Sequence, residues 1–298
     1  MSSRLTVMRA GPLTSIQDGG RFGMLRHGIS ASGPMDAGAF AEAGALAGGG
    51  SGGMEFTVAG LEIRLEQGRY RAGFAGGGFT VKHNGLALGW PGHVVLKAGD
   101  VLAITPGQRG NYGYLRFGAD IAVPAVMGSL ATSNRAGLGG LNGRVLRAGD
   151  VVELTGRSAG TATDSVRPDP LTGPIRVIWG LHADMFPQAL RERFLATAFT
   201  VSSRLDRMGV RLDDGAGVFA GAAALSLVSD AIVPGDIQIL GDGTPIVLMR
   251  DHQPTGGYPR IATIISADLD RFAQLRPGSP VAFEPVTVEH AHALLRSR

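Results

Sequence analysis

The sequence predicts a mainly β protein made of two similar domains, each a sheet of many short strands that closes into a barrel and carries about one main helix. Three observations lead to this class. One phrase of sequence occurs twice, short apolar segments alternate with turn residues, and only two segments have helical periodicity. The chain has 298 residues, of which 44% are hydrophobic and 18% charged, so it can bury two cores of ordinary size.

The repeated phrase runs over residues 55–65 and again over 230–240. Each copy begins with an acid, Glu55 or Asp230, has Val at the fourth position and Gly at the sixth, and continues into alternating aliphatic residues. The flanks repeat as well: 32–36 is matched to 205–209, and 96–100 to 275–279. A repeat of this period in two copies indicates a duplicated domain.

The division between the two copies is expected in the polar stretch 156–173, which is rich in Ser, Thr, Asp and Pro and has no periodicity. We therefore predict a first domain over 1–160 and a second over 161–298. A third Leu-Arg-Ala-Gly-Asp phrase, at 146–150, resembles those at 96 and 275. This phrase by itself indicates only a β-turn.

Strand-like segments dominate both halves. They are short and rich in Val, Ile, Leu and aromatic residues, with Gly, Asn or Pro between them. In Lys82-His83-Asn84-Gly85-Leu86 the Asn-Gly pair predicts a tight hairpin, because both central residues of such a turn need positive φ. The expected strands are 61–65, 79–82, 93–96, 101–105 and 111–117 in the first half, and 174–179, 236–240, 245–250, 260–265 and 280–288 in the second.

Two segments are predicted to be helices. Residues 35–47 follow Pro34, place Met35, Ala39, Ala43 and Leu46 on one face, and end in a run of glycines. Residues 186–199 begin with Pro187 in the first turn and carry apolar side chains at helical spacing. Each half therefore combines many strands with one helix, and closure into a barrel removes exposed sheet edges.

Composition excludes several classes of function. The net charge is only +3 and the arginines are scattered, so nucleic-acid binding has little support. The chain has no cysteine, which excludes disulfides and thiolate chemistry. The only histidine pair at ligand spacing is His290 and His292, and we expect no metal site. Neither a signal-peptide pattern nor a membrane-spanning run is present, so a cytoplasmic location is expected.

No standard catalytic motif is recognised. The glycine run 48–53 contains the GxGxxG pattern of dinucleotide-binding sites, but it follows a predicted helix instead of a strand, and no P-loop is present. Three polar clusters carry the chemistry instead. In the first, residues 17–21, which contain an Asp-Gly turn and Arg21, are followed by residues 28–36. This cluster fits either an anion site at the start of the helix or a simple cap by Ser32 or Gly33.

The second cluster is Ser203-Arg204-Leu205-Asp206-Arg207-Met208-Gly209, which suits a structural ion pair or a fork for a substrate carboxylate or phosphate. The third, residues 251–259, is the most unusual. Asp251 and His252 could exchange a proton there, and two glycines would let a ligand approach the backbone. The repeated acids, Glu55 and Asp230, mark either two related pockets or a shared structural turn.

These clusters, in this order, resemble the allophanate hydrolase subunit 2 family, also called the biotin-dependent carboxyltransferase or KipA/PxpC family. The resemblance extends over nearly the whole chain and the combination of motifs is specific. The matching stretches are 14–21, 32–36, 123–135 with Gly128-Ser129, Gly139-Gly140, Gly143-Arg144, 206–209, 235–238 and 255–259.

The resemblance implies two tandem cyclophilin-like β-barrel domains and a subunit of a larger assembly. Family members pair with a subunit-1 protein of the KipI/PxpB type. With a PxpA-type third component they form bacterial 5-oxoprolinase, which opens 5-oxoproline to glutamate with ATP. This chain would then be the C-type subunit of that complex, with ATP bound in the assembly.

Site roles follow as hypotheses. Asp251, His252 and Arg207 are the catalytic candidates, because they combine acid/base groups with a carboxylate-binding cation. The predicted substrate-binding residues are Arg135, Asp206, Gln253, Thr255, Gly256, Gly257, Tyr258, Ser32, Asp36 and Glu55.

Two alternatives stay open at this point. One is a carboxyltransferase subunit of a urea carboxylase or allophanate-type system, with biotin on a separate carrier. The other is a regulator that binds its KipI-type partner and turns over nothing. Departures from the family pattern bear on the choice: Pro254 stands where the family has Thr, and Gly76-Gly77-Gly78 lacks the acid usual in the first barrel.

Overall fold

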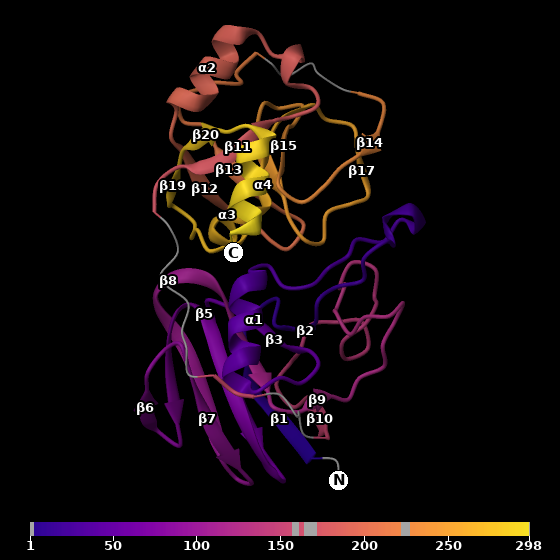
Figure 1. Cartoon of the computed structure of the whole chain (residues 1–298), viewed down its shortest axis with the longest axis vertical. Helices are drawn as coiled ribbons and strands as arrows, with labels where there is room; N and C mark the ends of the chain where they lie inside the picture. Colours follow the sequence, from indigo (N-terminus) through magenta and orange to yellow (C-terminus); the bar gives the residue numbers. More distant parts are fainter. Residues whose placement is uncertain (1–2, 157–160, 164–171, 222–226, 298) are drawn as a thin grey trace. The chain divides into compact units, whose positions relative to one another are not determined.

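The computed structural model describes residues 3–156, 161–163, 172–221 and 227–297 of the chain. It divides into two compact units (Figure 1). The first contains Met1–Gly23 and Ala31–Asp169, and the second contains Met24–Ser30 and Pro170–Arg298. The predicted boundary at 160/161 falls next to residues outside the described part, so its position stays a prediction.

The first unit is built on one antiparallel sheet of ten strands. Its main path runs in the order β2-β3-β8-β4-β1-β10-β9, while β5 pairs with β6, β7 and β8. The sheet curves into a half-barrel. Its strands are β1 Ser3–Ala10, β2 Ser15–Gln17, β3 Gly53–Thr57, β4 Leu61–Leu65, β5 Arg69–His83, β6 Leu86–Leu88, β7 Gly92–Lys97, β8 Val101–Phe117, β9 Asp120–Ile121 and β10 Val151–Thr155.

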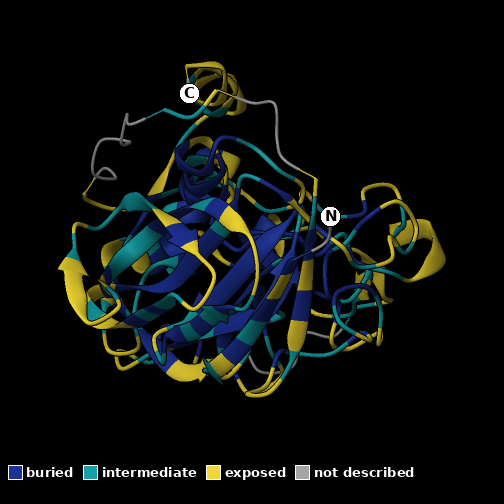
Figure 2. Cartoon of the chain, turned by 90° about the horizontal axis from the view of Figure 1, so that it is seen from below, coloured by how far each residue is buried: buried dark blue, intermediate teal, exposed yellow. Residues whose placement is uncertain are grey.

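The core of the first unit follows from strand alternation. In β4, Leu61, Ile63 and Leu65 are fully buried while Glu62 and Arg64 are half-buried, as a period of two requires. Figure 2 shows the result: the strands are mainly dark blue and the turns between them yellow. The predicted Asn-Gly hairpin is confirmed, since β5 ends at His83, β6 begins at Leu86, and Asn84 and Gly85 have φ of 50° and 85°.

Helix α1 (Ala37–Ala47) packs on this sheet, close to the predicted 35–47. Its N-cap is Asp36, whose Oδ1 accepts a hydrogen bond from the Ala39 N–H at 2.9 Å. The predicted cap by Ser32 or Gly33 is therefore wrong. A side chain does cap the helix, but it is that of Asp36. The helix ends at Gly48, which has φ of 88° and supports a left-handed C-terminal turn.

Close contact between α1 and β5 depends on Gly73. A Cβ at position 73 would lie 2.2 Å from the Ala43 carbonyl oxygen and 2.5 Å from the Ala47 nitrogen. We expect Gly73→Ala to lower the free energy of unfolding by about 1–3 kcal/mol, because the helix must move off the sheet. Gly89→Ala is the control, since a Cβ there meets nothing within 4 Å. Urea unfolding of both variants checks this; equal midpoints would contradict it.

The second unit contains an eight-stranded sheet in the order β19-β12-β13-β16-β15-β18-β11-β20 and a two-stranded ribbon, β14-β17. The two edge strands, β19 and β20, are separated by Ala282 alone, so the sheet returns on itself as a nearly closed barrel. The strands are β11 Ile175–Trp179, β12 Phe199–Leu205, β13 Gly209–Asp213, β14 Asp230–Ala231, β15 Asp236–Ile239, β16 Pro245–Leu248, β17 Thr255–Gly256, β18 Arg260–Ile264, β19 Pro280–Val281 and β20 Phe283–Pro285.

In the described part of this unit, three helices accompany the sheet, where about one was expected: α2 (Gln188–Ala196), α3 (Ser266–Ala273) and α4 (Val288–Arg296). Short 3-10 turns occupy Leu25–His27 and Ala183–Met185. Phe194 of α2 is fully buried against the rings of Phe199, Phe219 and Phe283, with centroids 5.0–6.2 Å away. The predicted mainly β class with two barrel-like sheets is confirmed.

The repeated Gly-Asp and Gly-Ser phrases are the same turn three times. Gly99, Gly149 and Gly278 have φ of 89°, 90° and 84°, and the residue after each donates its N–H to a carbonyl three residues earlier. The turn interpretation is therefore confirmed for all three. Within the described ranges, no helix combines the length and the apolar character that crossing a membrane requires.

Candidate functional site

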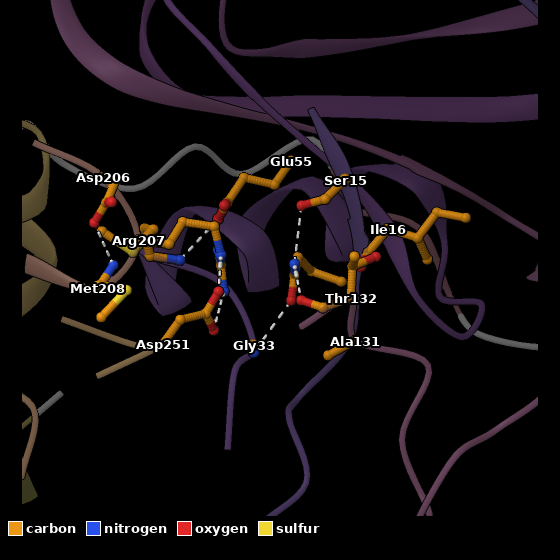
Figure 3. A network of polar contacts seen from close by, with 12 residues as sticks. Ser15, Ile16, Gly33, Glu55, Ala131, Thr132, Asp206, Arg207, Met208 and Asp251 are labelled. Carbon is orange, nitrogen blue, oxygen red and sulfur yellow. Dashed lines mark hydrogen bonds and ion pairs between the residues drawn. The ribbon is translucent and has the colours of Figure 1, made fainter. Parts of the chain in front are cut away.

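The strongest polar cluster of the second unit joins two loops far apart in sequence. Arg207 lies in the turn between β12 and β13, and Asp251 follows β16. The Arg207 Nε donates to Asp251 Oδ2 at 2.9 Å and Nη2 donates to Oδ1 at 3.2 Å, a bidentate pair (Figure 3). Each of these residues is 6% exposed. The Asp251 N–H also donates to the Arg207 carbonyl at 2.7 Å, which fixes both backbones.

Asp206, the neighbour of Arg207, has a different task. It is exposed, and its Oδ1 accepts from the Met208 and Gly209 N–H groups at 2.7 and 3.1 Å. These bonds shape the β12–β13 turn (Figure 3). The cation in the Asp-Arg phrase therefore pairs with Asp251, 44 residues away, and not with the adjacent acid.

His252 follows Asp251 and is only 2% exposed. Its Nδ1 lies 2.6 Å from the Gln253 carbonyl oxygen. Because a carbonyl only accepts, Nδ1 carries the proton, and a neutral ring then has its lone pair on Nε2. Burial lowers the pKa of His252, while the Gln253 carbonyl and the charges of Asp236 and Asp251 oppose that shift. At neutral pH this imidazole is a base with one defined tautomer.

The lowered pKa of His252 predicts a pH dependence of stability. Between the lowered pKa of the folded chain and about pH 6.5, the unfolded chain binds a proton at this histidine and the folded chain does not. The free energy of unfolding should therefore be highest above that pH and fall as the pH drops. His252→Gln is expected to flatten this fall in urea titrations from pH 8 to pH 5. His182, whose pKa is lowered by burial and by Arg260, contributes in the same window, so the double variant should be flatter still.

The loop after His252 is held by a ribbon and a buried amide. Thr255 and Gly256 form β17, which pairs with Asp230 and Ala231 of β14. The Gln238 Nε2 donates to the Tyr258 carbonyl at 3.2 Å, and a Cβ at position 256 would lie 2.6 Å from that nitrogen. Gly256 therefore lets the loop approach Gln238. Of the remaining predicted residues here, Gln253 and Gly257 are half-buried, and Thr255 and Tyr258 are exposed.

The repeated acid of this half, Asp230, is exposed and belongs to a second ion network, in which Arg260 and Asp236 are buried. Arg260 donates from Nη2 to Asp230 at 2.8 Å and from Nη1 to Asp236 at 3.3 Å and to the Ala231 carbonyl at 2.9 Å. Thr263 donates to the other oxygen of Asp236 at 2.7 Å. This network ties the ribbon to β15 and β18, which favours the structural interpretation of the repeated acid.

In the first unit the equivalent acid, Glu55, is fully buried. Its Oε2 accepts from the Met35 N–H at 2.8 Å and from the Tyr114 hydroxyl at 2.9 Å. The same hydroxyl accepts from the Asp36 N–H at 2.7 Å. Burial, and then the charges of Glu55 and Asp36, raise the pKa of Tyr114 well above its ordinary value. Tyr114 was missed in the sequence, because only the register of β3 with β8 places it opposite Glu55.

A second buried side chain holds the same segment. Gln17 accepts from the Gly33 N–H at 3.1 Å and donates to the Ser15 hydroxyl and to the Thr132 carbonyl (Figure 3). Ser32 lies just before Gly33, has φ of 56° and is 4% exposed. Its hydroxyl has no hydrogen-bond partner among the described residues.

Arg135 is exposed and lies in a short turn closed by the Ser133–Leu138 bridge of the first unit. The predicted site residues thus fall into two groups. Ser32, Asp36, Glu55 and Arg135 belong to the first unit, and the other predicted residues belong to the second. Within the second group the structure pairs Arg207 with Asp251, which is followed by the buried His252.

The chain matches the model of a known protein family over most of its length. The model of the carboxyltransferase domain, subdomain A and B, matches residues 27–285. The chain belongs to this carboxyltransferase domain family.

Its relatives define the match further. The C-type subunit of 5-oxoprolinase from Escherichia coli (strain K12) is 35% identical over 292 residues, which cover 96% of this chain and 93% of that one. Its Haemophilus influenzae counterpart is 32% identical, with 95% and 91% covered. The urea amidolyase of Saccharomyces cerevisiae is 30% identical over 97% of this chain but only 17% of its own length. The crystal structure of Kluyveromyces lactis urea carboxylase superposes with a TM-score of 0.88 at 28% identity, and the match covers 99% of this chain and 28% of that one.

Proposed function

We propose that this chain is the C-type subunit of an ATP-dependent 5-oxoprolinase, a complex that opens the lactam of 5-oxoproline to give glutamate. The observation that carries the proposal is the 35% identity to the Escherichia coli 5-oxoprolinase subunit, which extends over more than nine tenths of both chains. The Haemophilus influenzae protein matches over a similar share. A homologue that aligns along nearly its whole length is a stronger guide to function than one domain of a much longer enzyme.

Within the proposed reaction, the chain's own residues would bind and move protons. His252 offers a neutral Nε2 that can accept a proton, since Nδ1 is held by the Gln253 carbonyl. The Asp251 carboxylate accepts two hydrogen bonds from the Arg207 guanidinium, so we assign Asp251 the role of an acceptor that orients donors. In the second unit, Thr255, Gly256, Gly257 and Tyr258 would line the substrate, with Asp206 as a further candidate contact.

The residues of this chain that could bind a nucleotide are considered next to the requirements of a Mg–ATP site. A Mg–ATP site usually supplies a phosphate-binding loop or carboxylates that hold the metal. The sequence has no P-loop, and the described residues contain no group of three or more His, Asp or Glu side chains arranged to hold a metal ion. These residues do not fit a complete nucleotide site, and we therefore place ATP in the assembled complex and not in this chain alone.

The partners follow from the same proposal. We expect a subunit-1 protein of the KipI/PxpB type and a PxpA-type third subunit, in the cytoplasm. The test is co-expression of this chain with the subunit-1 reading frame, purification of the complex, and addition of the third component. ATP-dependent release of glutamate from 5-oxoproline is expected only when all three are present. A complete complex that forms but releases no glutamate would contradict the proposal.

A second candidate has its own support. The family is described as a carboxyltransferase domain, and fungal urea amidolyase and urea carboxylase match almost the whole of this chain. Under this alternative the chain would act on urea with biotin carried by a separate protein. The same preparation, assayed with urea, bicarbonate, ATP and a biotinylated carrier, separates the two candidates. A stable complex that is inactive in both assays would indicate the third possibility, a regulator that binds its KipI-type partner.

A further inference from the structure

Ser32 combines two unfavourable features at one buried position. Its hydroxyl is buried and has no hydrogen-bond partner in the described part of the chain. A buried polar group without a partner loses its hydration and gains nothing in return. Its backbone also has φ of 56°, in the left-handed region that disfavours residues with a Cβ.

The second feature sets Ser32 apart from similar positions. Among the described residues, the other non-glycine residues with positive φ are Leu13, Asn84, Met127 and Asn142, and all of them are exposed or half-buried. Asn84 and Asn142 belong to the residue types that tolerate this conformation. Ser32 is the one that is buried, so its conformation is not explained by an exposed turn.

Side chains from other parts of the first unit hold the backbone that follows Ser32 in place. Three side chains with no exposed surface, Gln17, Glu55 and Tyr114, accept the N–H groups of Gly33, Met35 and Asp36 at 3.1, 2.8 and 2.7 Å. Strained backbone persists where surrounding structure over-determines it, and such positions cluster at ligand sites. The three fully buried acceptors fix the backbone that follows Ser32 and leave its hydroxyl unpaired.

We propose, on the basis of the proposed function, that the Ser32 hydroxyl hydrogen-bonds the amide group of the small-molecule substrate. A hydroxyl both donates and accepts, so it can pair with an amide C=O and N–H. In the described part of the chain, the buried charged residues within this segment or bonded to it include Arg21, a cation, and Asp36 and Glu55, two acids. This balance favours a neutral amide over an anionic group at this position. The hydroxyl is covered in this conformation, so binding must uncover it.

The test compares two buried serines of the first unit. Ser129 is 1% exposed, donates to Asp18 at 2.6 Å and accepts from the Ala131 N–H at 3.0 Å. In the full chain, Ser129→Ala should lower the melting temperature, whereas Ser32→Ala should raise it by about 2–6 °C, because an unpaired hydroxyl is removed. Ser32→Gly, which also relieves the backbone, should raise it as well. A fall in both Ser32 variants would overturn the proposal.

The second readout is function in the reconstituted complex. Ser32→Ala is expected to reduce kcat/KM for 5-oxoproline by about 10-fold or more, mainly through KM, although the protein is more stable. Unchanged kinetics beside an active wild type would overturn the inference and leave the proposed function intact. If the wild-type complex is inactive with 5-oxoproline, the proposed function fails, and calorimetric binding of 5-oxoproline and of urea decides the inference. Binding that is lost in Ser32→Ala supports it, and absent or equal binding refutes it.

Discussion

Replacement of Asp251 by alanine is expected to lower the free energy of unfolding of the second unit by about 3–5 kcal/mol, because it removes one partner of a buried ion pair. Arg207 and Asp251 are each 6% exposed, and two hydrogen bonds of 2.9 and 3.2 Å join them. Without the carboxylate, the guanidinium loses both bonds in a place where water does not replace them. Activity of the reconstituted complex should fall by two orders of magnitude or more if Asp251 takes part as proposed.

The control for this change is an Arg–Asp ion pair at the surface of the same unit, joined by one hydrogen bond of 3.0 Å instead of two. Asp184 lies 3.0 Å from Arg191, and its side chain is 99% exposed. Asp184→Ala should cost less than about 1 kcal/mol. Trp179 lies in the second unit and Trp90 in the first, so a Trp90→Phe background lets fluorescence follow the second unit alone during urea unfolding. Equal losses in the two variants would contradict the buried pair, and full turnover of an intact Asp251→Ala complex would remove Asp251 from the site.

Features that depend on a few neighbouring residues could be predicted from the sequence. The hairpin at Asn84-Gly85 and the Gly-Asp turns were found because each requires a positive φ that few residue types adopt. The helix near 35–47 was found from its apolar spacing and its terminal glycines. Other predictions failed where tertiary contacts decide. The matched flanks at 32–36 and 205–209 have different structures, since Met35 precedes a helix and Met208 lies in a hairpin turn.

Long strands and short helices were harder to recognise. Residues 101–105 and 111–117 were predicted as two strands, but β8 is continuous, and β5 follows it through register shifts at Gly76–Gly78. The glycines interrupt the apolar pattern without interrupting the pairing. Helix α3 was missed because it follows β18 almost directly and its cap residue, Ile265, makes no side-chain cap. The helix also buries a charged residue, which hides the apolar pattern in its sequence: Asp268 is 1% exposed and pairs with Arg176 and Arg271.

The loops that carry the site residues could be predicted from the sequence, but the contacts between those residues could not. Both the Arg207 loop and the Asp251 loop were selected for their unusual polar content, yet no local rule pairs residues 44 positions apart. The pair exists because β13 and β16 are neighbours and bring the two loops to one end of the sheet. The same holds for Tyr114, which looks like any other strand aromatic until β3 and β8 are in register.

Replacement of Glu55 by alanine is the second change with a large expected effect. Two buried donors, the Met35 N–H and the Tyr114 hydroxyl, would lose their acceptor. Since each unsatisfied buried group costs about 1–3 kcal/mol, the first unit should lose about 2–6 kcal/mol of unfolding free energy. The segment 32–36 would also lose one of its fixed points, so Ser32 should no longer be held in its left-handed conformation. Fluorescence of Trp90 in a Trp179→Phe background reports the first unit during urea unfolding.

A double-mutant cycle with Tyr114→Phe isolates the contact itself. Tyr114→Phe removes the hydroxyl that joins Glu55 to the Asp36 N–H, so the two changes should be non-additive by about 0.5–3 kcal/mol. Glu153→Ala is the matched control, because Glu153 is a partly exposed glutamate that pairs with Arg4 at 3.6 Å in the same unit. It should cost less than about 1 kcal/mol and be additive with Tyr114→Phe. Additive effects of Glu55→Ala and Tyr114→Phe would show that the carboxylate and the phenol stabilise the segment independently. The buried network would then not be the device that fixes it.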